Sequence, residues 1–97
     1  MKTQKRFGRA LQALRKMRGL TQEDFSLVSS RTYLSVLEHG SKSPTMSKLE
    51  ELAELLEVHP VTLCALGYAP RDKKGIDALC EQIRMELLEL ATSRTAS

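Results

Sequence analysis

The 97-residue sequence has few aromatic side chains: two phenylalanines, two tyrosines and no tryptophan. Its core therefore has to consist mainly of leucine, with alanine and valine, and the length allows one such core but not two. No run of about 18 apolar residues occurs, so no membrane-spanning segment is expected. The basic N-terminus lacks the apolar stretch of a secretory signal. We therefore expect one small domain that resides in the cytoplasm and does not associate with a membrane.

Cysteine and histidine are also scarce, and their spacing argues against a metal site. Cys64 and Cys80 lie in leucine-rich segments, so we expect two reduced cysteines packed among apolar neighbours; a disulfide or redox switch is the alternative. His39 and His59 are 20 residues apart, with no nucleophile beside either. Neither C-x-x-C nor H-x-x-x-H spacing is present. The sequence thus predicts no enzyme, no metal and no other cofactor.

Acidic residues are absent before Glu23, so the net charge of +3 hides a strong asymmetry. Residues 1–48 contain ten Lys/Arg and three Asp/Glu, whereas residues 49–97 contain five and nine. This distribution favours binding of a polyanion, such as nucleic acid, by the N-terminal half. An uneven surface without function is the alternative, and charge alone does not decide between them.

Helical spacing of apolar residues predicts an all-α chain without strands. Glycine, proline and hydroxyl side chains mark the ends of the helices. The predicted helices are a first one through Phe7–Met17, a brief second one after the cap Thr21, then 31–39, 46–56, a fifth that begins at Pro60, and 76–92. Residues 1–66 would form one domain, 67–75 a linker, and 76–92 a separate C-terminal helix.

The helix predicted over residues 31–39 has one apolar and one hydrogen-bonding face. Leu34 and Leu37 point inward together. Thr32, Val36 and His39 face away from the core, with Ser35 beside them and Arg31 at the exposed N-terminal tip. The candidates for reading bases are Arg31, Thr32, Ser35 and Val36. Arginine can bind guanine through two hydrogen bonds, hydroxyls can pair with several bases, and valine can contact the thymine methyl group. Such a helix after a tight turn fits the major groove of DNA, although a solvent-exposed face of an ordinary bundle has the same pattern.

Residues 7–66 resemble the Cro/C1-type (XRE-like) helix-turn-helix family of phage repressors and bacterial regulators. The resemblance lies in Arg15, "GLTQED" at 19–24, "SRTYLS" at 30–35, "LEHG" at 37–40, Pro44 and "KLEELAELLEV" at 48–58. It implies a five-helix lambda-repressor-like DNA-binding domain, followed here by a C-terminal amphipathic helix. It also implies a sequence-specific regulator of transcription, and we expect a repressor that binds a palindromic operator in double-stranded DNA as a homodimer.

The resemblance also implies roles for individual residues. The base-reading positions of the family match the four outward residues of the third helix. The positions that contact the DNA backbone are Gln22, Ser30, Tyr33, Lys42 and Ser43. Gln22 would also brace the recognition helix, and Arg15 and Glu38 would form a structural ion pair. The alternatives are a solvent-exposed loop lysine at position 42 and an aromatic residue at the edge of the core at position 33.

The turn departs from the family pattern. Family members usually carry "A-x-x-x-G-V-S" between the two helices, whereas "SLVSS" at 26–30 is shorter and lacks the glycine. We expect Val28 to supply the apolar side chain that the family's turn valine provides. The recognition helix would then begin at a slightly different angle.

The C-terminal helix carries an apolar seam with 4-3-4-3 spacing, flanked by further apolar residues. The seam residues are Ile76, Cys80, Ile83, Leu87 and Leu90. We expect this seam to form the homodimer; alternatively, the helix folds back onto its own domain and leaves dimerisation to the fourth and fifth helices. The alternative function is an antitoxin-like or adaptor module whose main role is binding an unknown protein partner.

Overall fold

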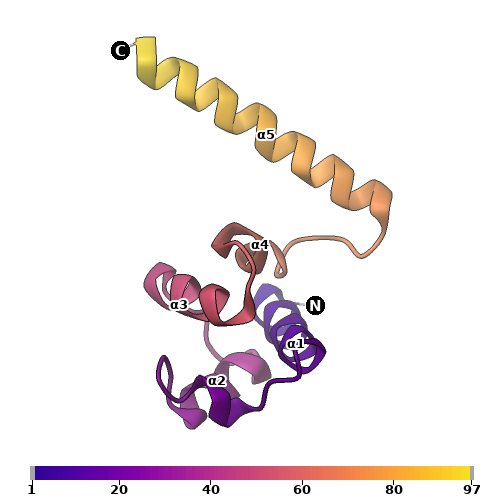
Figure 1. Cartoon of the computed structure of the whole chain (residues 1–97). Helices are drawn as coiled ribbons and strands as arrows, with labels where there is room; N and C mark the ends of the chain where they lie inside the picture. The colour runs from indigo at the N-terminus through magenta and orange to yellow at the C-terminus, as the bar shows by residue number, and fades with distance from the viewer. Residues whose placement is uncertain (1, 97) are drawn as a thin grey trace.

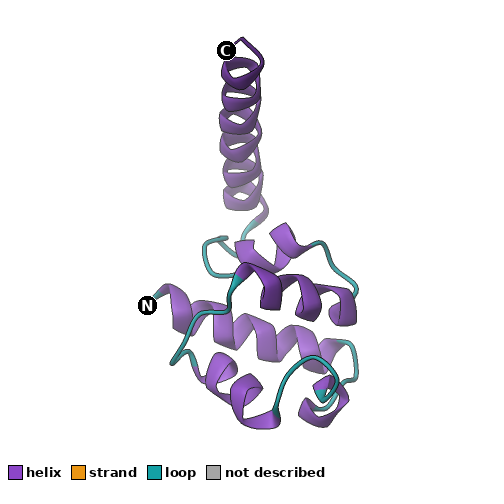
Figure 2. Cartoon of the chain, turned by 90° about the vertical axis from the view of Figure 1, so that its left-hand side faces the viewer, coloured by secondary structure: helices purple, strands orange, loops and turns teal. Residues whose placement is uncertain are grey.

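A computed structural model describes residues 2–96 of the protein (Figure 1). Five α-helices and one short 3-10 helix follow one another: α1 (Thr3–Met17), η1 (Gln22–Phe25), α2 (Arg31–His39), α3 (Met46–Leu56), α4 (Pro60–Ala65) and α5 (Lys73–Ala96). Within residues 2–96 the elements are helices joined by loops, with no strand (Figure 2). The all-α prediction is therefore confirmed, and the brief second helix is the 3-10 helix η1.

Four of the helices begin at residues whose side chains accept backbone hydrogen bonds, as the sequence predicts. At η1, Thr21 Oγ1 accepts from the backbone N–H of Asp24, and the Asp24 carboxylate accepts from the N–H of Thr21 at 2.7 Å. Ser30, Thr45 and His59 likewise cap α2, α3 and α4. These bonds satisfy N–H groups that have no partner within the helix, and so they determine where each helix starts.

Two glycines let the backbones of α1 and α2 touch. A Cβ atom at Gly8 would lie 2.4 Å from the carbonyl oxygen of Leu37. Gly40, which ends α2 with a φ of 79°, would place a Cβ atom 2.6 Å from the Cα atom of Lys5. Larger side chains at these positions would force the two helices apart. The two glycines thus allow α2 to pack directly against α1.

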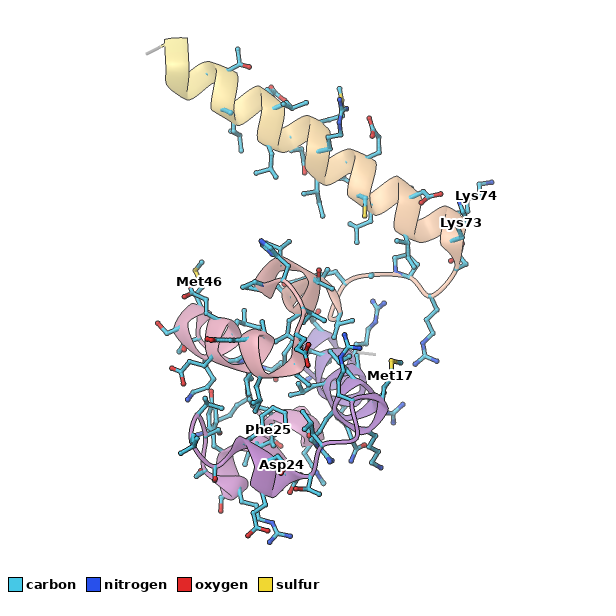
Figure 3. All side chains as sticks on the ribbon, in the orientation of Figure 1. Met17, Asp24, Phe25, Met46, Lys73 and Lys74 are labelled. Carbon is cyan, nitrogen blue, oxygen red and sulfur yellow. The ribbon has the colours of Figure 1, made fainter. Side chains whose placement is uncertain are left out.

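The core lies between α1, α2, α3 and α4 and consists mainly of leucine. Its fully buried large side chains are Phe25, Leu11, Leu34, Leu37, Leu52, Leu56 and Leu63. Phe25 lies at η1, between the helices (Figure 3). Val28 is half-buried and packs against this core, as expected from the shortened turn. The turn is therefore closed by an apolar contact, although it lacks the family's glycine.

The C-terminal helix is longer than the predicted 76–92, and the connection before it is shorter than the predicted 67–75. α5 begins at Lys73 because the Asp72 carboxylate accepts the backbone N–H of Gly75 at 2.9 Å, just before the first apolar residue of the seam. Apolar spacing alone could not reveal this start. The helix also continues to Ala96, past the last apolar residue of the seam. It crosses above α4, and its C-terminal end points away from the other helices (Figures 1 and 2).

The expectation that both cysteines are packed among apolar neighbours was wrong. Cys64 and Cys80 are free thiols, and both are exposed. Leu63, the neighbour of Cys64, fills the core from α4, and Cys80 belongs to the apolar side of α5, which no other helix covers within residues 2–96. In that same part of the chain, no helix combines the length and apolarity needed to cross a membrane. The described residues also contain no cluster of three metal-binding side chains.

Candidate nucleic-acid interface

Helix α2 presents its polar side away from the core. Leu34 and Leu37 are fully buried on its inner side. The four residues expected to read bases lie elsewhere on the helix: Arg31 and Thr32 are exposed, and Ser35 and Val36 are half-buried. The long, charged side chain of Arg31 therefore lies at the N-terminal end of α2, the end at which DNA-reading helices contact base edges.

A buried ion pair joins α2 to α1 on the side of α2 that faces the core. Arg15 Nε and Glu38 Oε2 are 2.7 Å apart, and Arg15 Nη2 donates to Glu38 Oε1 at 3.1 Å. Arg15 Nη1 also donates to the carbonyl oxygen of Leu20 at 2.9 Å. The hydrogen bond to Glu38 raises the pKa of Arg15, while burial acts in the opposite direction. The ion pair predicted between these residues is thus present, with two parallel hydrogen bonds of the kind that gives arginine–carboxylate pairs a defined geometry.

Gln22 connects η1 to the same network. Its Nε2 donates to Glu38 Oε1 at 3.2 Å, and its Oε1 accepts from the hydroxyl of Ser35 at 3.0 Å. The Gln22 side chain therefore braces α2, as the family resemblance implies. Because the one hydroxyl hydrogen of Ser35 is donated to Gln22, the oxygen of Ser35 remains available as an acceptor. In this arrangement Ser35 could accept a hydrogen bond from an amino group of adenine or cytosine.

The other candidates for backbone contact lie on both sides of α2. The Ser30 hydroxyl caps α2 by accepting the N–H of Tyr33. Tyr33 is half-buried, and Lys48 Nζ lies 5.8 Å from its ring centroid. The Ser43 hydroxyl accepts a hydrogen bond from Gln4 Nε2 at 3.0 Å. Lys42 is exposed in the loop that follows α2.

A basic cleft between α1 and α2 was not predicted from the sequence. Lys5, Arg9 and Gln12 of α1 line it, opposite Ser35 and His39 of α2, and its volume is ≈ 480 Å³. Lys5 and Arg9 are exposed and one helical turn apart, so both cations stand on the same side of α1. That spacing was visible in the sequence, but only the approach of α1 to α2 brings these side chains next to α2.

Residues of the predicted dimerisation seam form a second surface. Ile76, Cys80, Ile83 and Leu87 line an apolar groove whose other wall is α4, and Leu90 is exposed further along α5. The seam residues are therefore brought together on one side of α5. They do not contribute to the cleft beside α2.

Two short helices joined by a tight turn, η1 and α2, are the arrangement that gives a helix-turn-helix protein its name. Residues 11–63 match the family described as helix-turn-helix, and the chain belongs to that family. The chain is also 43% identical over 65 residues to an uncharacterized HTH-type transcriptional regulator, y4dJ, of Sinorhizobium fredii (strain NBRC 101917 / NGR234), a match that covers 65% of this chain and 84% of that protein. No solved structure matches the chain. The Cro/C1-type resemblance is thus confirmed.

Proposed function

We propose that the protein is a sequence-specific regulator of transcription that binds double-stranded DNA and acts as a homodimeric repressor. The observation that carries this proposal is the clamped recognition helix. Arg15 of α1 and Gln22 of η1 hold α2 through four side-chain hydrogen bonds to its Glu38 and Ser35, while the exposed N-terminal end of α2 stays polar. A rigid helix with a hydrogen-bonding outer side is what direct readout of the major groove requires.

Base recognition would be divided among the four outer residues of α2. Arg31 would bind guanine through two hydrogen bonds, because its guanidinium group presents a planar pair of donors. Thr32 would hydrogen-bond either donors or acceptors, and Ser35 would act as an acceptor. Val36 would contact the methyl group of thymine.

Contacts with the DNA backbone would position this helix. Gln22 and Ser30 lie on one side of α2, and Lys42 and Ser43 lie in the loop that follows it. Tyr33 would reach the sugar-phosphate on the flank. Such contacts carry little sequence information but determine the register of the protein on the duplex.

A homodimer on a palindromic operator accounts for the additional apolar surface on α5. One recognition helix reads only a short half-site, whereas a twofold pair reads two half-sites about 34–36 Å apart. Occupation of an operator that overlaps a promoter would repress transcription without any effector or cofactor. The proposed location of this activity is the cytoplasm.

Selection of bound sequences from a random pool of duplex DNA tests the proposal. We expect a single enriched motif made of two inverted half-sites, and binding to it should weaken steeply with salt concentration. The matched control is the Arg31→Ala variant, whose enriched motif should lose preference at one position of each half-site. A pool that remains random after repeated rounds would refute sequence-specific binding.

The same selection discriminates the alternative adaptor function, which the open apolar groove on α5 favours. An adaptor would bind a protein partner through that groove and would not enrich any DNA sequence. Salt-dependent, sequence-specific binding of purified protein to DNA would reject a pure adaptor.

A further inference from the structure

The apolar groove between α4 and α5 is open to solvent. Val61 lies on its α4 wall, and Ile76, Ile83 and Leu87 lie on its α5 wall; its volume is ≈ 670 Å³. Among the described residues that line it, only Arg84 is charged. Side chains of α5 project both towards α4 and away from it (Figure 3). The groove is thus a space between two apolar helical surfaces, and α5 does not fold back onto α4.

The connection between α4 and α5 holds this groove open. Arg6 Nη2, on α1, donates to the carbonyl oxygen of Ala69 at 2.8 Å and ties the connection to the domain. Asp72 caps the first turn of α5. Pro70 packs so closely against Gly75 that a Cβ atom at position 75 would lie 2.6 Å from the Pro70 Cβ atom. A connection with these contacts has little freedom to let α5 close down onto α4.

Helix α5 is apolar on two sides. Ile83, Leu87 and Leu90 fall within about 60° of one another around its axis, whereas Met85 lies about 200° from Ile83. Leu88, about 140° from Ile83, lies between these two sides: it lines the groove and also contacts the surface around Met85. Five of the ten large apolar side chains that are exposed in the described chain belong to α5, including Met85 and Leu88. A helix that is apolar on one side needs one neighbour, and a helix that is apolar on two sides needs two.

We propose that the groove of each protomer is filled by α5 of a second copy of this chain. The four helices would then lie in the order α4, the partner's α5, α5, the partner's α4. In this arrangement the seam of α5 packs against the seam of the partner's α5, and the Met85 side, with Leu88 at its edge, packs against the partner's α4. The contact is twofold and self-complementary. This inference rests on the proposed homodimer and names how its subunits join.

The area of such a contact suits a stable dimer. A 24-residue helix is about 36 Å long and about 10 Å wide. Covering most of two of its sides would bury roughly 700 Å² from each protomer, close to the ~800 Å² per partner of a standard stable interface. A pair of α5 helices joined by one seam alone would bury about half of that. The other half of the buried area would come from the second apolar side of α5, packed against α4 in the partner's groove.

The two native cysteines allow a test without any substitution. Cys80 lines the groove, whereas Cys64 lies on α4 outside it and is also exposed. At a concentration where the chain is dimeric, alkylation followed by mass spectrometry should modify Cys64 readily and Cys80 at least about tenfold more slowly. After dilution below the dissociation constant, both thiols should react at similar rates.

Three aspartate variants test the contribution of each wall of the groove to dimerisation. Leu87→Asp changes the α5 seam, Val61→Asp changes the α4 wall, and Leu27→Asp is a control outside the groove. All three side chains are more than half exposed in the monomer, so each variant should keep its fold, which circular dichroism would verify. In sedimentation, Leu87→Asp and Val61→Asp should each raise the dimer dissociation constant roughly 100-fold or more, because an unpaired carboxylate would be buried. Leu27→Asp should sediment like the native chain.

The remaining outcomes are distinguishable. If Leu87→Asp dissociates the dimer and Val61→Asp does not, the α5 seams pair without α4, and the groove insertion is rejected while the homodimer stands. If Cys80 is protected in a chain that sediments as a monomer, α5 has folded back and the inference is rejected. If the native chain stays monomeric even on enriched operator DNA, the homodimer itself is rejected.

Discussion

Replacing Glu38 with glutamine should remove the charge that balances Arg15 while preserving the shape of the side chain. Both residues are buried, with exposed fractions of 7% and 8%, so Arg15 would be left without a counterion in a nearly solvent-free site. Breaking a buried pair in this way costs about 3–5 kcal/mol. Glutamine keeps one acceptor, and Arg15 keeps its bond to the Leu20 carbonyl, so we expect a loss of about 3 kcal/mol in the free energy of unfolding.

Urea denaturation of the full chain, followed by circular dichroism, measures this loss directly. For a domain of this size, about 3 kcal/mol corresponds to a Tm lower by roughly 12–24 °C. The matched control is Glu54→Gln on α3, whose carboxylate is exposed and whose loss should change stability by less than about 0.5 kcal/mol. A double variant, Arg15→Met with Glu38→Leu, should recover much of the stability, because it strands no charge.

A loss below about 1 kcal/mol for Glu38→Gln would refute this reasoning, because it is the magnitude of a solvent-exposed pair. The pKa of Arg15 is raised in the folded protein. A group of this kind contributes its full stabilisation below its unfolded-state pKa and loses it only as pH rises through the folded-state pKa. The contribution of the Arg15 charge should therefore be constant around neutral pH and vanish only in strong alkali.

Four further variants test the DNA interface and the packing that supports it. Arg31→Ala should weaken binding to the selected operator by about 1–3 kcal/mol and flatten the base preference at one base pair. Lys42→Ala should instead weaken binding to all sequences and reduce the slope of log affinity against log salt concentration by about one. Titrations of both variants with DNA at several salt concentrations measure these effects. Unchanged preference in Arg31→Ala would reject its role in base reading. The double variant Lys5→Ala/Arg9→Ala should reduce the salt slope by about two without changing the preferred sequence, and an unchanged slope would show that the basic cleft does not face phosphate. Gly8→Ala should destabilise the fold by about 1–3 kcal/mol, because its Cβ atom would meet backbone atoms of α2 at 2.4 Å; a neutral effect in urea denaturation would show that α1 can move away.

The features of the fold that local chemistry determines could be predicted from the sequence. Leu34 and Leu37 had to face inward once residues 31–39 were identified as a helix, and both are fully buried. The caps at Thr21 and Ser30 follow from the same short-range rules. The partner of Arg15 lies 23 positions away, and periodicity does not predict such a distant contact. The family resemblance, rather than the residues alone, indicated that ion pair.

Features that depend on how helices approach one another could not be predicted in this way. Lys5 and Arg9 are two cations among many in the basic half of the chain, and their place beside α2 depends on contacts between distant backbones. The bond from Ser35 to Gln22 likewise depends on the angle between η1 and α2. The exposure of Cys80 depends on where α5 lies relative to the other helices, and in the proposed dimer a second copy would cover it. Local sequence rules carry no information about any of these distances.

Contacts of α1 link the proposed DNA-binding surface on α2 to the proposed dimer interface on α5. Arg15 and Glu38 fasten α2 to α1, and Arg6, on that same helix α1, holds the connection that leads into α5. Helices α2 and α5 are therefore both tied to α1, at opposite ends of its sequence. In the proposed dimer this arrangement would set the distance between the two recognition helices through α1, rather than leave it to a flexible linker. The spacing of the two half-sites in the operator would then depend on Arg6 and the α4–α5 connection as much as on the residues that touch DNA.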